Sequence, residues 1–345
     1  MIVIGIDVSK DSNKVCAKER REDGGSRILR TKTFPNSGIG HEDLYEWMKG
    51  HKMAEALVVM EATGVYHEDL LWYLYDCGAR CAVVQPGRIN AFSRTLDHKA
   101  KTDRLDASLI AEYGLAMYGQ LKPWEPASES IRDIRALSRA LERANQAAGV
   151  LKNHRHALMH SHRSSETAKF ILEKSEKVLQ TLEEEIDELE KAIEEVVRGD
   201  EKVSKTTEAL SAIHGMTSFT AARVLAETNC FENFSGSRKL VSYAGLDVKV
   251  YQSGTIDRRS GISKRGNAHL RGMLFMNAMT VMMREKPFKE FRERLLGRGV
   301  NRKVIVVAVM RKLLVLMFAI VKHGTVFDPD YDWHKAHGVP RKGEA

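Results

Sequence analysis

The chain has 345 residues, of which 43% are hydrophobic and 29% are charged, so it can build ordinary cores and is not expected to be disordered. This length has room for two domains with a helical spacer between them. The formal net charge of +8 favours a polyanionic partner, either a nucleic acid or a membrane surface.

A membrane partner is not indicated by the apolar segments. The N-terminal residues MIVIGIDVSK lack a cationic flank followed by a long apolar region, so no signal peptide is predicted. The apolar run from Val304 to Val321 has Arg311 and Lys312 at its centre, where each would cost about 3 kcal/mol in a bilayer, so we expect a buried helix. The four cysteines lack zinc-site spacing and are expected to be reduced, structural thiols of a cytoplasmic protein.

The first third of the chain, residues 1–125, alternates strand-like and helix-like segments. Strands are predicted at Ile2–Val8, Lys14–Lys18, Ile28–Phe34, Ala56–Met60 and Cys81–Val84, and helices at Gly40–Gly50 and Tyr66–Cys77. The order of three strands, a helix, a strand, a helix and a strand is that of the ribonuclease H fold. The pattern alone predicts a mixed α/β domain.

Residues 126–203 are predicted to form a helical arm. The helical pattern from Glu129 to Arg163 carries four arginines on one face, which favours a nucleic-acid contact over a merely solvated stripe: Arg132, Arg135, Arg139 and Arg143. The following segment has a heptad seam over about four heptads, which predicts a coiled coil: Leu172, Ser175, Leu179, Leu182, Ile186, Leu189, Ile193 and Val196. This seam can pair with the preceding helix or with a second copy of the chain.

Residues 204–328 are predicted to form a second, mainly α-helical domain, followed by a loose tail at 329–345. The segment LSAIHGMTSFTAARVLAET, from Leu210 to Thr228, resembles a helix-hairpin-helix, although an ordinary helical hairpin would have the same pattern. A stretch rich in Gly and Ser carries basic residues expected to contact phosphates: Arg258, Arg259, Lys264, Arg265 and Arg271.

Four acidic residues are the candidate metal ligands. Asp7 and Glu61 each end an apolar strand, and Asp103 and Asp106 are three residues apart at the start of a predicted helix. If they converge, their mutual repulsion requires a cation, and carboxylate oxygens favour Mg²⁺ or Mn²⁺. Such ions can assist phosphodiester chemistry. Each acid taken singly could instead cap a turn or a helix.

The segments GIDVSK, MEATGVY and KTDRLDA, in that order, resemble the acidic DEDD set of the insertion sequence 110 family of transposases, which includes the pilin-gene DNA invertases. The resemblance continues through IHGMTSFTAARVLAE, LVSYAGLDV, YQSG and SKRGNAHLRGML, and so covers nearly the whole chain. It implies a RuvC-type, ribonuclease H-like N-terminal domain in which Asp7, Glu61, Asp103 and Asp106 bind the metal. It also implies that Ser253 of the C-terminal domain is a nucleophile, a role for which Ser260 and Ser263 are neighbouring competitors.

The resemblance implies a DNA transposase or recombinase that acts through a phosphoserine intermediate with Mg²⁺ assistance and is guided by a structured bridge RNA. The alternatives are a RuvC-like, metal-dependent, structure-specific endonuclease without serine chemistry, and a non-catalytic RNA- or DNA-binding scaffold. A recombinase must cut four strands and each chain offers one such serine. We therefore expect a homodimer that forms a tetramer on synaptic DNA, associated with the nucleoid.

Overall fold

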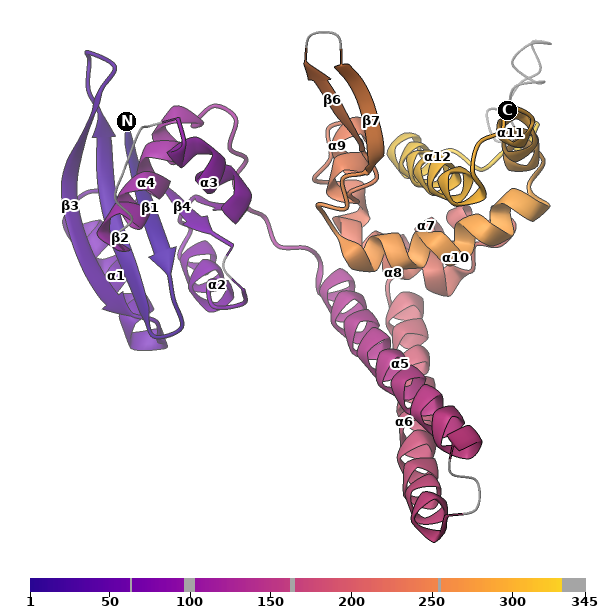
Figure 1. The fold of residues 1–345 in the computed structure, drawn as a ribbon. Coiled ribbons are helices and arrows are strands. Elements are labelled where there is room, and N and C mark those ends of the chain that lie inside the picture. The colour runs from indigo at the N-terminus through magenta and orange to yellow at the C-terminus, as the bar shows by residue number, and fades with distance from the viewer. Residues whose placement is uncertain (63, 96–102, 162–164, 254–255, 331–345) are drawn as a thin grey trace. The chain divides into compact units, whose positions relative to one another are not determined.

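The computed structural model describes residues 1–62, 64–95, 103–161, 165–253 and 256–330 (Figure 1). The chain forms two compact units, Met1–Pro126 and Ala127–Ala345. The first boundary lies one residue beyond the predicted end of the N-terminal domain. The division of the second unit into an arm, a transposase domain and a tail stays a prediction, and most of that tail lies outside the described residues.

The first unit contains a five-stranded sheet with the order β3-β2-β1-β4-β5. Strands β1 (Ile2–Val8), β2 (Ser12–Arg20) and β3 (Ser26–Pro35) form an antiparallel meander, while β4 (Leu57–Glu61) and β5 (Cys81–Val84) run parallel to β1. This order and these directions are those of the predicted ribonuclease H-like fold. The predicted strands are present, with ends that differ by a few residues.

Helices cover both faces of this sheet. On one face, α1 (Gly38–Gly50) and α2 (Glu68–Asp76) pack against alternate residues of β1, including Ile4 and Ile6. On the other face, α3 (Pro86–Ser93) and α4 (Asp103–Ala116) pack against Val3 and its neighbours. Because successive side chains of a strand point to opposite faces, β1 is buried on both sides and positions its last residues rigidly.

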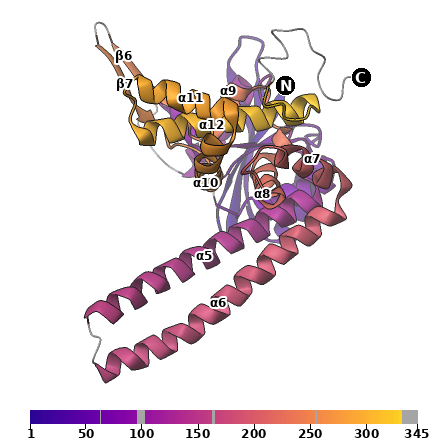
Figure 2. The same ribbon diagram turned by 90° about the vertical axis from the view of Figure 1, so that its right-hand side faces the viewer.

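In the second unit, α5 (Glu129–Ser161) and α6 (Glu166–Gly199) lie side by side as a helical hairpin (Figures 1 and 2). The seam of α6 lies against α5 of the same chain: Arg155 Nη1 donates hydrogen bonds to the Leu172 carbonyl at 2.8 Å and to Ser175 Oγ at 3.2 Å. Of the two pairings that the sequence leaves open for the seam of α6, the pairing with the preceding helix of the same chain is therefore present. Pairing with a second copy, and coiled-coil geometry, stay predictions.

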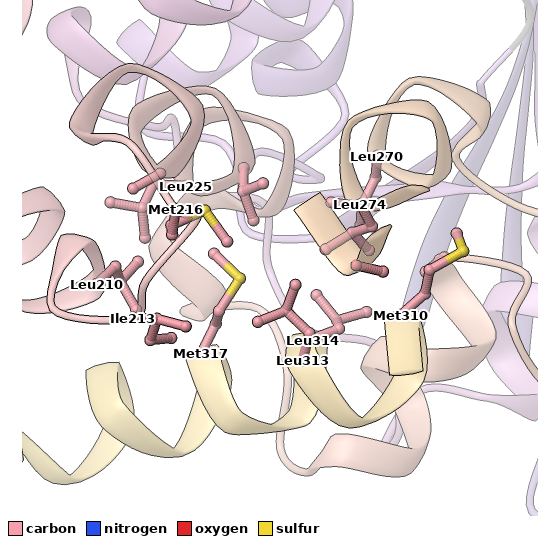
Figure 3. Close-up of a cluster of buried hydrophobic side chains, with 14 of the residues drawn as sticks. Leu210, Ile213, Met216, Leu225, Leu270, Leu274, Met310, Leu313, Leu314 and Met317 are labelled. Carbon is pink, nitrogen blue, oxygen red and sulfur yellow. The ribbon is translucent and has the colours of Figure 1, made fainter. Parts of the chain in front are cut away.

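The remaining elements of this unit are α7 (Glu201–Ser211), α8 (Ser218–Thr228), the short 3-10 helix η1 (Asn229–Phe231), α9 (Ser237–Tyr243), β6 (Val248–Ser253), β7 (Ile256–Ile262), α10 (Ala268–Arg284), α11 (Lys286–Gly297) and the long apolar helix α12 (Arg302–His323). Helix α12 packs against α7, η1, α9, α10 and α11. Figure 3 shows leucines and methionines of α12 meeting those of the neighbouring elements. Helix α12 is long and apolar enough to cross a membrane, yet Leu313, Leu314 and Met317 are fully buried in this core. The expectation of a buried helix agrees with this packing.

The base of the α5–α6 hairpin belongs to the same core. Ile131, Ile134 and Leu141 of α5 are buried with Ile193 and Val197 of α6 against the elements around α12. Helices α7 and α8 are joined by a tight turn in which Gly215 has a positive φ of 96°. This turn fits both a helix-hairpin-helix and an ordinary helical hairpin, so the DNA-binding motif stays a prediction.

Candidate active site

Asp7 and Glu61 lie at the same end of the sheet on neighbouring strands. β1 and β4 are parallel, and the register pairs Ile6 with Met60, so the next residue along each strand is one of the two acids. Gly5 and Val59, two residues earlier, both face α4. Because strand residues two apart share a face, Asp7 and Glu61 also lie on the α4 side. Both are half-buried.

Two glycines let α4 lie directly on β1. A Cβ atom on Gly5 would be 2.3 Å from both the Ala107 carbonyl oxygen and the Ala111 nitrogen. A Cβ atom on Gly114 would be 2.6 Å from Val3 Cγ1. Residue 114 thus lies near residue 3, and residues 107 and 111 near residue 5. The helix therefore runs opposite to β1, and its first turn points toward the end of β1 that carries Asp7.

That first turn contains the other two acids. Asp106 is half-buried, and Asp103 is the first residue of α4 with its side chain outside the described part of the structure. The topology thus brings all four predicted acids to one end of the sheet. Lys14 of β2 is the register partner of Asp7 and places a cation beside the acids. Lys14 has no signature in the sequence, because its position beside Asp7 depends on the strand register.

Glu112 holds α4 on the sheet. Its Oε2 atom accepts hydrogen bonds from Lys18 Nζ at 2.7 Å and from Ser26 Oγ at 2.5 Å. Burial alone would raise the pKa of Glu112, but the hydrogen bonds from Lys18 and Ser26 and the charges of Lys18 and Arg20 together lower it. Glu112 has no signature in the sequence, because an isolated acid in a helix is typical of a solvated surface.

The donor chemistry fits a divalent cation. Carboxylate oxygens are the ligands that Mg²⁺ and Mn²⁺ prefer, and the half-buried setting increases the need for a cation. Among the described side chains, no three from His, Cys, Asp and Glu lie close enough together to hold a metal ion. This holds for Asp7, Glu61 and Asp106 as well, and the side chain of Asp103 lies outside that description.

Ser253 is the last residue of β6 and lies near the tip of the β6–β7 hairpin, in the second unit. The register pairs it with Ile256, and Arg258 and Arg259 follow on β7. The side chains of these residues, and of Ser260, lie outside the described part of the structure. Ser263 is below the hairpin, where its Oγ lies 2.5 Å from Asp247 Oδ1. That contact gives Ser263 a structural role.

The predicted nucleic-acid contacts divide into two groups. Arg132 and Arg143 of α5 and Lys264 and Arg265 below the hairpin are exposed, as a phosphate contact requires. The other three described arginines bind within the chain: Arg135 Nε donates to the Ala226 carbonyl at 2.8 Å, Arg139 pairs with Glu227, and Arg271 Nη1 donates to the Ala244 carbonyl at 3.0 Å. These intramolecular roles have no signature in the sequence, and the nucleic-acid contacts stay predictions.

Two transposase family models match the sequence. One, of the DEDD transposase domain of IS110 elements and described as "Transposase", matches residues 4–164. The other, described as "Transposase IS116/IS110/IS902 family", matches residues 207–293. The first begins within β1 and includes all four acids, and the second includes Ser253.

Relatives along most of the chain have related names. The chain is 27% identical over 329 residues to the "Pilin gene-inverting protein" of Moraxella bovis. That alignment covers 94% of this chain and 97% of that protein. The chain is 24% identical over 336 residues to the "Transposase for insertion sequence element IS1111A" of Coxiella burnetii, which covers 89% and 86% respectively. Among solved structures, RuvC of Thermus thermophilus aligns with 36% of this chain and 100% of its own, at 15% identity and a TM-score of 0.29.

Proposed function

We propose that this chain, a member of the IS110/IS116 family of transposases, which cut and rejoin DNA, acts through Ser253 with assistance from a divalent metal ion held by the acids. The observation that supports the proposal is that Asp7, Glu61 and the first turn of α4 lie at the same end of the sheet. Such a set of carboxylates has a purpose in a DNA-processing enzyme only if a cation joins them, because the substrate is itself an anion.

In the proposed reaction, Ser253 Oγ attacks the scissile phosphorus. The bond from phosphorus to the 3′ oxygen breaks, the serine proton passes to solvent, and the leaving oxygen becomes a 3′ hydroxyl. The product is a 5′-phosphoserine ester. A 3′ hydroxyl of another strand then attacks this phosphorus, which forms the new DNA linkage and restores the serine. Each step exchanges one phosphoester for another, so no external energy source is required.

The acids have a separate task in this scheme. Asp7, Glu61, Asp103 and Asp106 would hold Mg²⁺ or Mn²⁺, which supplies neutralising charge at the phosphate when bound. The close contact of α4 with β1 at Gly5, and the hydrogen bonds of Glu112, keep the acids of the helix near those of the strands. Lys14 reduces the repulsion between Asp7 and its neighbours while no metal is bound.

The resemblance to bridge-RNA-guided members extends the proposal to a structured guide RNA that selects the donor and target DNA. The exposed Arg132 and Arg143 on α5 support an RNA contact along the arm, and Lys264 and Arg265 support a DNA contact below the hairpin. Because four strands must be cut, we propose a homodimer that forms a tetramer on synaptic DNA. Such a protein would be cytoplasmic and associated with the nucleoid.

The test is covalent trapping on a denaturing gel. Purified protein, its associated RNA and DNA that carries the element's junction are mixed with Mg²⁺. Ser253→Ala and Asp7→Asn are compared with the wild type, and Ser260→Ala is the matched control in the same hairpin. We expect an adduct in the wild type and in the control, and none in the other two variants. Cleavage that survives Ser253→Ala without an adduct would establish the metal-dependent endonuclease instead.

A further inference from the structure

The β6–β7 hairpin that carries Ser253 is closed at its base by backbone hydrogen bonds. The N–H of Ser263 donates to the carbonyl of Asp247 at 2.8 Å, and the N–H of Asn267 donates to the carbonyl of Tyr243 at 2.8 Å. The two chain segments thus stay paired below the hairpin, where β6 follows α9 and β7 leads into α10.

A buried carboxylate lies under this base. Glu227, at the end of α8, is 3% exposed. Asn267 Nδ2 donates to Glu227 Oε2 at 2.6 Å, and the Tyr243 hydroxyl donates to the Glu227 carbonyl at 3.0 Å. Glu227 therefore holds both segments of the base, through one side chain from each.

The charge of Glu227 is compensated from the arm. Arg139 of α5 donates to the carboxylate through Nε at 3.0 Å and through Nη2 at 3.3 Å. Burial alone would raise the pKa of Glu227, but the hydrogen bonds from Arg139 and Asn267, with the charges of Arg139 and Arg135, together lower it. The carboxylate is thus ionised at neutral pH and fixed between α5 and the base of the hairpin.

Neighbouring contacts make the base stiff. Asn267 uses its second polar atom, Oδ1, to cap α10 by accepting from the N–H of Leu270 at 2.9 Å. Arg271 Nη1 donates to the carbonyls of Ala244 at 3.0 Å and of Gly266 at 3.2 Å, one on each side of the base. A Cβ atom on Gly266 would be 2.2 Å from the carbonyl oxygen of Tyr243, so the two segments cross in direct contact.

Small movements of this base are amplified at the serine. Ser253 is six residues beyond Asp247, so at about 3.3 Å per strand residue it lies roughly 20 Å from the base. At that distance a tilt of about 3° moves Ser253 by about 1 Å, and a misplacement of this size can reduce a reaction rate by about 100-fold. The precision of the attack thus depends on contacts far from the phosphate.

We propose that Glu227 is a positioning residue for Ser253, which it aligns through Asn267 and Tyr243 at the base of the hairpin. The proposal rests on the proposed nucleophilic role of Ser253. It also explains why Arg139, on the arm, binds within the chain: the arginine fixes the carboxylate that fixes the hairpin. Glu227 itself does not contact DNA in this scheme.

Two variants remove side-chain hydrogen bonds at the base, and each also removes the one from Asn267 Nδ2 to the Tyr243 hydroxyl. Asn267→Ser keeps a good capping residue for α10 but loses the donor to Glu227. Tyr243→Phe loses the hydroxyl that donates to the Glu227 carbonyl. The matched control is Thr228→Val, next to Glu227, which removes a buried hydroxyl that donates to the Val224 carbonyl at 2.8 Å and does not touch the base. The full chain is used throughout, with its RNA and junction DNA.

Three quantities are measured: the single-turnover rate of adduct formation at saturating DNA, the DNA dissociation constant, and the hydrogen exchange of backbone amides 248–262. We expect Asn267→Ser to slow adduct formation about 10- to 100-fold, with unchanged DNA affinity and faster amide exchange in the hairpin. Thr228→Val should leave both the rate of adduct formation and the amide exchange of the hairpin as in the wild type, even if its melting temperature falls as much as that of Asn267→Ser.

Equal rates for Asn267→Ser and Thr228→Val would overturn the proposal, and so would unchanged hairpin exchange in both base variants. If the wild type itself forms no adduct, the proposed function fails. In that case the exchange measurement still decides whether Glu227 holds the base of the hairpin. Faster amide exchange in Asn267→Ser and Tyr243→Phe than in the wild type supports this role of Glu227, and exchange equal to that of the wild type refutes it. The two failures are therefore distinguishable.

Discussion

Gly5→Ala tests whether the contact between α4 and β1 builds the acidic site. The added methyl group would lie 2.3 Å from two backbone atoms of α4, those of Ala107 and Ala111. Neither atom belongs to a flexible side chain, so the whole helix must move until these contacts reach at least 3.0 Å. Overpacking of this kind costs about 1–3 kcal/mol. For a unit of this size we expect a fall in melting temperature of about 5–15 °C.

The same displacement should weaken metal binding, because metal ligands must be held to within about 0.5 Å of their productive geometry. Helix α4 carries Asp103 and Asp106, so both move away from the strand acids together. We expect the affinity for Mn²⁺ to fall about 10-fold, as when the supporting contacts of a metal site are lost. Adduct formation should be slowed to a similar extent.

Tryptophan fluorescence is a suitable readout of the unfolding of the first unit, because three of the four tryptophans lie in it: Trp47, Trp72 and Trp124. Mn²⁺ binding is measured by electron paramagnetic resonance on the same samples. Gly87→Ala, in α3, is the matched control because a Cβ atom there would meet nothing within 4 Å. If Gly5→Ala matched this control in melting temperature and Mn²⁺ affinity, α4 would not be held at Gly5 as described.

Further predictions concern charge, pH and thiols. When the logarithm of the RNA affinity is plotted against the logarithm of the salt concentration, Arg143→Ala should make the slope shallower by roughly 1, at an unchanged melting temperature. Arg139→Ala should instead lower the unfolding free energy by about 2 kcal/mol, because it leaves a buried carboxylate without its partner. The folded protein lowers the pKa of Glu112 below its ordinary value of 4.5, so the ionised side chain stabilises the fold above about pH 4.5 and this stabilisation is lost as the pH falls through the folded-state pKa. Glu112→Gln should therefore flatten the acid limb of a curve of unfolding free energy against pH. It should also lower the unfolding free energy near pH 7 by about 1–2 kcal/mol. Burial raises the pKa of Cys81 to about 12, so a thiol reagent at neutral pH should modify the more exposed Cys77 in the native protein and Cys81 only after denaturation.

The sequence predicts the sheet of the first unit well because its signals are local. Each strand is a short apolar or alternating run bounded by polar or Gly-containing breaks, and Pro86 marks the end of the last one. The position of α4 on the sheet could not be predicted in the same way. It depends on Gly5 and Gly114, which are ordinary glycines in the sequence and become significant only when the helix is seen to cross them.

The candidate acids could be found from the sequence because two of them follow apolar strands directly and the other two have helical spacing. The residues that support them could not. Lys14 matters through strand register, and Glu112 matters through Lys18 and Ser26, which are 94 and 86 residues away in the chain. No local pattern reports a contact of that separation.

The arginines of α5 show where periodicity stops being informative. Spacing by three or four residues places Arg132, Arg135, Arg139 and Arg143 near one face of the helix, and this is equally compatible with a nucleic-acid contact and with packing. The structure separates them because α8 covers only part of that face: Arg135 reaches the Ala226 carbonyl and Arg139 reaches Glu227, while the outer two stay exposed. A guanidinium bound to a buried carboxylate contributes little to phosphate binding, because its charge is already compensated. Arg132 and Arg143, which the chain does not bury against α8, are therefore the two that we expect to take part in the proposed RNA contact.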